Sequence, residues 1–245
     1  MRPILYTSGD SVVWGAELKD KSRERFSYLV SEELDMVDCN NASAGVSNDY
    51  IYRQTMRDVS HWLQERKCWS EESGWVYSNQ MYVIIGWTAP TRFEWWNGKS
   101  FQQERLWTGY DKWGKNDKDR TTEDEFVLNQ TSDIPSYIRT FNHIIGLSAF
   151  LDLYKIPYHF FNVFYEYDFE NFQLEDRFPD SLRLDPFGRD ESQICLTELW
   201  NNLPMDFTNI TMYNYLKERN GEFLPRNHPS KESHKIWADY IKNEI

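Results

Sequence analysis

A serine near the N-terminus and a histidine near the C-terminus are the residue types that acyl transfer requires. Gly9-Asp10-Ser11 places a hydroxyl directly after a short apolar run, and Asn227-His228-Pro229 precedes the last helical pattern of the chain. A serine hydroxyl is a poor nucleophile at neutral pH and needs an imidazole to accept its proton. The pair therefore predicts a nucleophile, Ser11, and its base, His228, in a fold that brings the two ends of the chain together.

Four segments come in the order of the sequence blocks of a known protein family. They are Gly9-Asp10-Ser11, the segment from Asn41 to Asn48 with Gly45 at its centre, Gly86-Trp87-Thr88, and Asn227-His228-Pro229. Together they resemble the SGNH/GDSL hydrolases, whose blocks span almost the whole chain. The resemblance implies a serine esterase without a cofactor, built on a flavodoxin-like sheet.

The resemblance also implies a role for each block. Ser11 would be the nucleophile, and the N–H groups of Ser11 and Gly45 would donate to the oxyanion of the tetrahedral intermediate. Thr88 stands where the family has an asparagine, so its hydroxyl would be a third donor. His228 matches the family's histidine, whereas Pro225 stands where the family has the aspartate. We therefore expect an imidazole without a carboxylate, whose second nitrogen could be held by a backbone carbonyl.

An aromatic segment follows the third block and suggests a surface for a carbohydrate. Between about residues 90 and 135 the hydrophobic period is lost, and tryptophans stand among arginines and lysines. Exposed aromatic faces beside an active site can stack on sugar rings, and the alternative is a second small core. Three tryptophans at the start of this region are candidates for substrate binding: Trp87, Trp95 and Trp96. Trp107 and Trp113 could extend the same surface.

Strands and helices alternate in the way that would position these residues. Apolar runs predict strands at 3–8, 36–43, 81–85 and 158–163, and helical spacing predicts helices at 21–35, 49–66, 136–154, 208–219 and 231–243. Such alternation predicts an α/β fold, a three-layer α/β/α sandwich with a mostly parallel sheet. Gly9, Gly45 and Gly86 each follow a predicted strand, at the edge where open α/β sheets bind ligands. We expect residues 1–245 to form one domain, with the aromatic segment as an insert.

Composition and charge exclude several functions. The 27 basic and 39 acidic residues give a net charge of −12, which disfavours a nucleic-acid partner. The apolar run at the N-terminus is too short for a signal peptide or a membrane span, so we expect a soluble protein made in the cytoplasm. Three cysteines without zinc spacing predict reduced thiols and no metal site: Cys39, Cys68 and Cys195.

Two functions remain open. The first is a serine esterase that removes acyl groups from a small ester or an acylated glycan, such as an O-acetylated carbohydrate. The second is a catalytically weak or inactive binding or structural protein on the same fold, which the changes at Thr88 and Pro225 favour. A resemblance to uncharacterised proteins of tailed bacteriophages adds a virion role to this second alternative. A nucleotide-binding protein is disfavoured, because no G-x-G-x-x-G motif follows the first strand.

Overall fold

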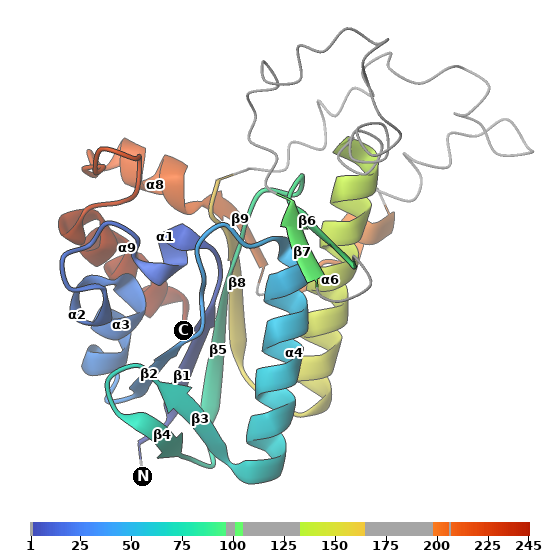
Figure 1. The fold of residues 1–245 in the computed structure, drawn as a ribbon, viewed down its shortest axis with the longest axis horizontal. Coiled ribbons are helices and arrows are strands. Elements are labelled where there is room, and N and C mark those ends of the chain that lie inside the picture. The colour runs from blue at the N-terminus through green and yellow to red at the C-terminus, as the bar shows by residue number, and fades with distance from the viewer. Residues whose placement is uncertain (1, 97–100, 105–132, 165–197, 206) are drawn as a thin grey trace, which may run out of the picture.

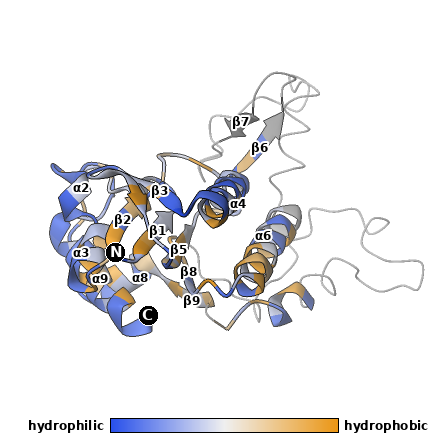
Figure 2. Cartoon of the chain, turned by 90° about the horizontal axis from the view of Figure 1, so that it is seen from below, coloured by the Kyte–Doolittle hydropathy of each residue, from blue (hydrophilic) through white to orange (hydrophobic). Residues whose placement is uncertain are grey.

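A central sheet lies between two layers of helices (Figures 1 and 2). The computed structural model describes residues 2–96, 101–104, 133–164, 198–205 and 207–245. Five parallel strands form the sheet in the order β2-β1-β5-β8-β9. They are β1 (Ile4–Ser8), β2 (Val37–Asn40), β5 (Met81–Trp87), β8 (Tyr158–Asn162) and β9 (Phe207–Thr211). The predicted α/β class with a parallel sheet is confirmed, and the strand order is flavodoxin-like.

Helices cover both faces of the sheet. One face carries α4 (Asn48–Glu65) and α6 (Asp133–Leu153). The other carries α1 (Ser11–Trp14), α3 (Phe26–Glu33), α8 (Met212–Glu218) and α9 (Lys231–Glu244), with the short α2 (Lys21–Glu24) beside them. The view along the strands separates these two groups clearly (Figure 2). None of the described helices is long and apolar enough to cross a membrane.

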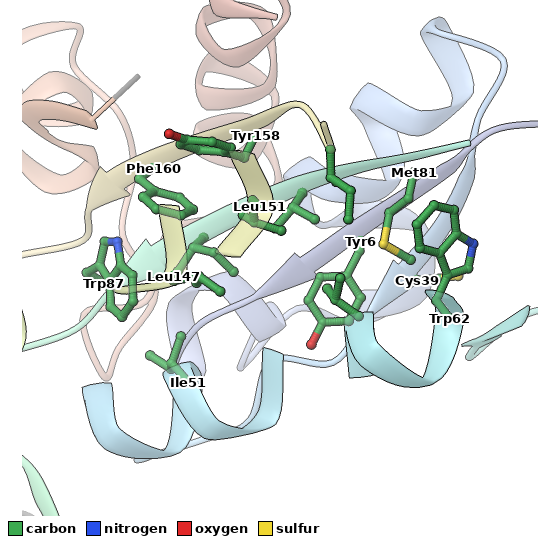
Figure 3. Packing of buried hydrophobic residues seen from close by; sticks show 14 of the residues in the cluster. Tyr6, Cys39, Ile51, Trp62, Met81, Trp87, Leu147, Leu151, Tyr158 and Phe160 are labelled. Atoms are coloured by element: carbon green, nitrogen blue, oxygen red, sulfur yellow. The ribbon is translucent and has the colours of Figure 1, made fainter. Parts of the chain in front are cut away.

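The alternation of side chains along each strand builds two hydrophobic cores. On β1, Ile4 and Tyr6 join the core under α4 and α6, whereas Leu5 joins the core under α3 and α9. Figure 3 shows the first of these cores, where Tyr6 and Trp87 pack among side chains of both helices. Since both faces of the sheet are covered, the central strand β5 is a nearly continuous apolar run, as is typical of parallel sheets, whereas the edge strands β2 and β9 carry polar residues.

Several elements differ from those that the sequence predicted. The helix expected at 21–35 is interrupted at Arg25, whose ψ of 152° is extended. The helix expected at 208–219 begins only at Met212, because residues Phe207–Thr211 form the edge strand β9. Two antiparallel hairpins were not predicted: β3 (Lys67–Ser70) with β4 (Gly74–Tyr77), and β6 (Phe93–Trp96) with β7 (Phe101–Glu104).

Two glycines let the ends of β1 and β5 approach each other under α1. A Cβ on Gly9 would lie 2.4 Å from a Val13 methyl and 2.9 Å from the Gly86 carbonyl oxygen. A Cβ on Gly86 would lie 2.6 Å from the same methyl. No side chain larger than hydrogen fits at either position without movement. The helix that begins at Ser11 is therefore seated directly on the topological switch point of the sheet.

The buried His234 makes the stability of the fold depend on pH. Its Nδ1 accepts a hydrogen bond from the Phe26 N–H at 3.2 Å, and burial lowers its pKa to about 3. In the unfolded chain this imidazole binds a proton near pH 6.5, whereas in the folded chain it stays neutral down to about pH 3. The free energy of unfolding therefore falls as the pH drops below about 6.5. Between pH 7.5 and 5 this histidine alone should cost about 2 kcal/mol.

Urea unfolding at these two pH values should detect that loss. His143 and His159, whose pKa values burial lowers to about 4, act in the same direction, so the wild type must be compared with a His234→Gln variant. The variant should lose about 2 kcal/mol less than the wild type between the two pH values. An equal loss in both proteins would show that His234 titrates normally in the folded state.

Candidate active site

The structure brings Ser11 and His228 together across 217 residues of sequence. Ser11 is the first residue of α1, just beyond β1, and His228 lies in the turn that leads into α9. The Ser11 Oγ lies 3.1 Å from His228 Nε2, which is hydrogen-bonding distance. The His228 side chain is 18% exposed, so the pair lies at the surface, where a small molecule can reach it.

A carboxylate that the sequence did not indicate holds the other ring nitrogen. Glu17 Oε2 lies 2.7 Å from His228 Nδ1 and also accepts the backbone N–H of Arg226 at 3.2 Å. The hydrogen bond with His228 is the main reason why the pKa of Glu17 is lowered from its usual value. This contact contradicts the expectation of an imidazole without a carboxylate, which rested on Pro225 at the position where the resemblance implies an aspartate.

The backbone on both sides of this contact is held in a left-handed conformation. Glu17 has a φ of 66° and Asn227 a φ of 63°, a region that costs non-glycine residues about 1–3 kcal/mol. The Tyr213 hydroxyl donates to the Asn227 carbonyl and so ties the histidine turn to α8. Burial raises the pKa of Tyr213, and its ring packs between those of Phe164 and Phe223, which keeps this hydroxyl a donor.

Asp10 and Arg92 surround the predicted third oxyanion donor. The Thr88 hydroxyl donates to Asp10 Oδ2 at 2.9 Å and accepts from Arg92 Nη1 at 2.7 Å. Arg92 also contacts Asp10 Oδ2 at 3.0 Å, and Asp10 Oδ1 caps α1 through the Val12 N–H. Thr88 is therefore next to the loop that carries Asp10 and Ser11, with its hydroxyl directed at a carboxylate. Its role as a donor to a substrate oxygen stays a prediction.

The remaining predicted residues fall into three groups. Gly45 lies in the turn between β2 and α4 with a φ of 69°, on the same sheet edge as Ser11. Trp87 is fully buried in the core against Phe160, so the prediction that it binds substrate is wrong. Trp95 and Trp96 are on β6, where only their backbone is described, and Trp107 and Trp113 lie outside the described residues.

The described residues offer no alternative centre for metal chemistry. Within these ranges, no group of three or more histidine, cysteine, aspartate or glutamate side chains could hold a metal ion. Cys39 and Cys68 are buried, free thiols, as predicted, and Cys195 lies outside the described residues. Among the described residues, Ser11, His228 and Glu17 form a continuous series of polar contacts, which is the candidate catalytic arrangement.

The hydrogen bonds of His228 predict its tautomer. The neutral ring should carry its proton on Nδ1, donated to Glu17, and leave Nε2 free to accept from Ser11. A ¹⁵N-detected correlation spectrum of the imidazole side chains above pH 8 should show Nδ1 protonated in the wild type, and a mixture of tautomers in Glu17→Ala. A wild-type ring protonated on Nε2 would contradict the assigned contacts.

The chain is similar to several solved structures. A protein of the G-D-S-L family from Desulfitobacterium hafniense is 11% identical, with a TM-score of 0.43 and full coverage of both chains. The esterase EstA from Pseudoalteromonas is 12% identical, with a TM-score of 0.47, covering 99% of this chain and 96% of that one. An acetyl xylan esterase, Est2A, from Butyrivibrio proteoclasticus is 13% identical, with a TM-score of 0.39, and the match covers 98% of this chain and 63% of that one. The esterase activities named here belong to those proteins.

The sequence itself matches a family defined without a function. Among curated proteins none matches the chain. Residues 20–245 match a protein family described as a family of unknown function, DUF6071. The match includes His228 and begins after Ser11 and Glu17. Since it covers most of the sequence, the chain belongs to the DUF6071 family.

Proposed function

We propose that the protein is a serine esterase that transfers an acyl group from an ester to water. The observation that carries the proposal is the continuous contact from Ser11 Oγ through both nitrogens of His228 to Glu17, at 3.1 and 2.7 Å. A nucleophile, a base and an orienting carboxylate in this order are the parts of a catalytic triad. The substrate class that we favour is an acylated carbohydrate.

The geometry supports a complete two-step reaction. As Ser11 Oγ attacks the ester carbonyl, His228 Nε2 takes its proton, and Glu17 stabilises the imidazolium through Nδ1–H. His228 then gives the proton to the departing alcohol, which leaves an acyl group on Ser11. Water attacks that group in the second step, with the same histidine as base, and restores the free serine.

The oxyanion would be stabilised by backbone donors from two loops. Within the described ranges, neither the Ser11 N–H nor the Gly45 N–H donates to another residue, so both are available to a substrate oxygen. Each such donor contributes about 3 kcal/mol to the transition state. The Thr88 hydroxyl is the third donor that we propose, and it would exchange its bond to Asp10 for one to the oxyanion.

Hydrolysis of p-nitrophenyl acetate by four variants tests the proposed reaction. Ser11→Ala and His228→Ala should abolish turnover, because they remove the nucleophile and the base. Glu17→Gln should lower kcat by about 10²- to 10⁴-fold, because it keeps the shape of the side chain and removes its charge. His234→Gln, at a histidine in the final helix and outside the site, is the matched control and should keep wild-type kcat at pH 7.5. Turnover that survives in Ser11→Ala would show that Ser11 is not the nucleophile. No turnover in the folded wild type would leave a binding or structural protein, such as a virion component.

Substitution of Thr88 tests the third oxyanion donor. Thr88→Val keeps the side-chain shape and removes the hydroxyl, so kcat should fall by about 10- to 1000-fold while the circular dichroism spectrum is unchanged. Thr88→Ser retains a hydroxyl and should keep most of the rate. A valine variant as active as the wild type would show that the N–H groups of Ser11 and Gly45 suffice.

A further inference from the structure

A cavity beside the proposed catalytic site is built from aromatic and amide side chains. Its volume is about 570 Å³, and it lies between the loop after β2, the helix α4 and the β3–β4 hairpin. Neither Ser11 nor His228 lines it. We name it the hairpin pocket, and its principal walls are Asn41, Gln54, Asp58, His61, Trp69 and Trp75.

Two tryptophans of the hairpin expose half of their surface at this pocket. Trp69 and Trp75 are cross-strand partners, 50% and 53% exposed, with ring centroids 5.7 Å apart. The ammonium of Lys67 lies 5.2 Å from the centroid of Trp75, and the ring of His61 lies 5.8 Å from it. Large aromatic side chains exposed together in this way, and held in position by neighbours, mark a binding surface.

The inner wall of the pocket is polar and already ordered. Asp58 Oδ2 accepts from the amides of Asn41 and Gln54, at 2.8 Å each, and from the Tyr6 hydroxyl at 3.0 Å. Each amide donates to this carboxylate through its nitrogen, so its carbonyl oxygen remains an acceptor for a ligand. The Nε2 of His61 is buried and has no partner among the described residues. Hydroxyl groups of a ligand would find both donors and acceptors here.

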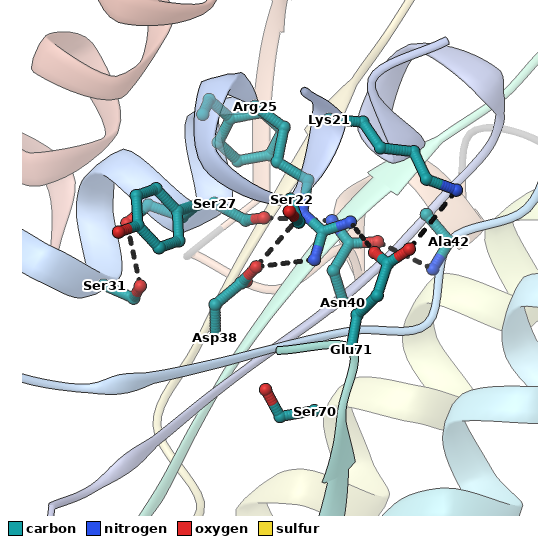
Figure 4. A network of polar contacts seen from close by, with 12 residues as sticks. Lys21, Ser22, Arg25, Ser27, Ser31, Asp38, Asn40, Ala42, Ser70 and Glu71 are labelled. Atoms are coloured by element: carbon teal, nitrogen blue, oxygen red, sulfur yellow. Dashed lines mark hydrogen bonds and ion pairs between the residues drawn. The ribbon is translucent and has the colours of Figure 1, made fainter. Parts of the chain in front are cut away.

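The charges around the hairpin pocket are neutralised by one another. Arg57 pairs with Asp58 at 3.1 Å and Lys67 pairs with Glu65 at 3.5 Å. Glu71, in the turn of the hairpin, pairs with the buried Arg25 at 2.8 Å and with Lys21 at 3.4 Å, which fixes the hairpin to the domain (Figure 4). A carboxylated or sulfated ligand would therefore find no unpaired cation among these residues.

We infer that the hairpin pocket binds a neutral oligosaccharide. Sugar rings present flat C–H faces to aromatic rings and hydroxyl groups at their edges, which matches exposed tryptophans above a wall of amides. A lipid chain would instead have to cover the polar groups around Asp58 without hydrogen-bonding them, which is costly.

The location of the pocket connects it with the proposed reaction. Trp14, three residues after Ser11 on α1, lines the pocket, and so does Ser43, whose N–H donates to the Gly9 carbonyl at 3.0 Å. A glycan held by the hairpin would thus extend toward the loop that carries the nucleophile. The assignment of this glycan as the acylated substrate rests on the proposed esterase function, whereas its binding does not.

Calorimetric titration of the Ser11→Ala protein tests the inference without turnover. The probes are the hexasaccharides of glucose, xylose, mannose and N-acetylglucosamine in β-1,4 linkage, with hexagalacturonate as the charged comparison. At least one neutral probe should bind with a Kd between about 10 μM and 1 mM. Trp69→Ala and Trp75→Ala should each weaken that binding about tenfold or more, which corresponds to the loss of one stacked ring.

Tyr77 provides the matched control. It lies on the same exposed face of the hairpin, opposite Lys67, and does not line the pocket. Tyr77→Ala should leave the Kd within about twofold of that of the parent. Trp75→Phe, which keeps an aromatic face, should restore part of the affinity and exclude a folding defect.

Each outcome of this experiment decides between the two proposals. No binding of any neutral hexasaccharide, binding that both tryptophan variants retain, or a preference for hexagalacturonate would overturn the glycan pocket. Binding as predicted, in a protein whose wild type hydrolyses no ester, would remove the esterase and leave the pocket. Ester hydrolysis without glycan binding would do the reverse.

Discussion

One buried carboxylate joins the segments that carry the proposed catalytic site. Asp10 is fully buried, and its two oxygens accept from the Val12 N–H, the Thr88 hydroxyl and Arg92. A buried carboxylate without such partners would cost several kcal/mol, so these contacts must form together. They join the start of α1, the end of β5 and the segment that leads to β6. The position of Ser11 depends on this junction, because it is the next residue in the chain.

The rest of the site is added to this junction from the C-terminal part of the sequence. The turn before α9 brings His228 to Ser11, and Tyr213 and Glu17 hold that turn from two sides. Glu17 comes from the loop after α1, so the proposed nucleophile and the proposed orienting carboxylate are six residues apart in the chain. The left-handed backbone at Glu17 is the local cost of aiming its side chain at the histidine.

The sequence predicted those features that have a local physical signal. Continuous apolar runs predicted β1, β5 and β8. Gly9 follows β1 as predicted, whereas Gly86 lies within β5, which continues to Trp87. Ser11 and His228 were predicted because the order of four short segments resembles a known family. The edge strand β9 was assigned to a helix, because its polar residues Thr208, Asn209 and Thr211 lack the apolar run of a central strand.

Features that depend on contacts between distant residues were missed. Nothing in the local sequence of Glu17 distinguishes it from other exposed glutamates, and only the folded chain places it against His228. Trp87 was predicted to bind substrate beside the third block, yet side chains alternate between the two faces of β5, and this alternation places Trp87 in the core. The exposed tryptophans were expected after residue 90, and the structure shows Trp69 and Trp75 on a hairpin whose strands are too short to give a clear period.

The central claim is that Ser11 is activated by His228 and Glu17, and covalent labelling tests it most directly. A fluorophosphonate reacts with an activated serine far faster than with an ordinary one, because the imidazole accepts the proton during attack. Intact-protein and peptide mass spectrometry of the folded wild type should show a single adduct on Ser11, and the adduct should form at least about 100-fold more slowly in His228→Ala. An unlabelled folded wild type, or labelling at the same rate without His228, would contradict the account.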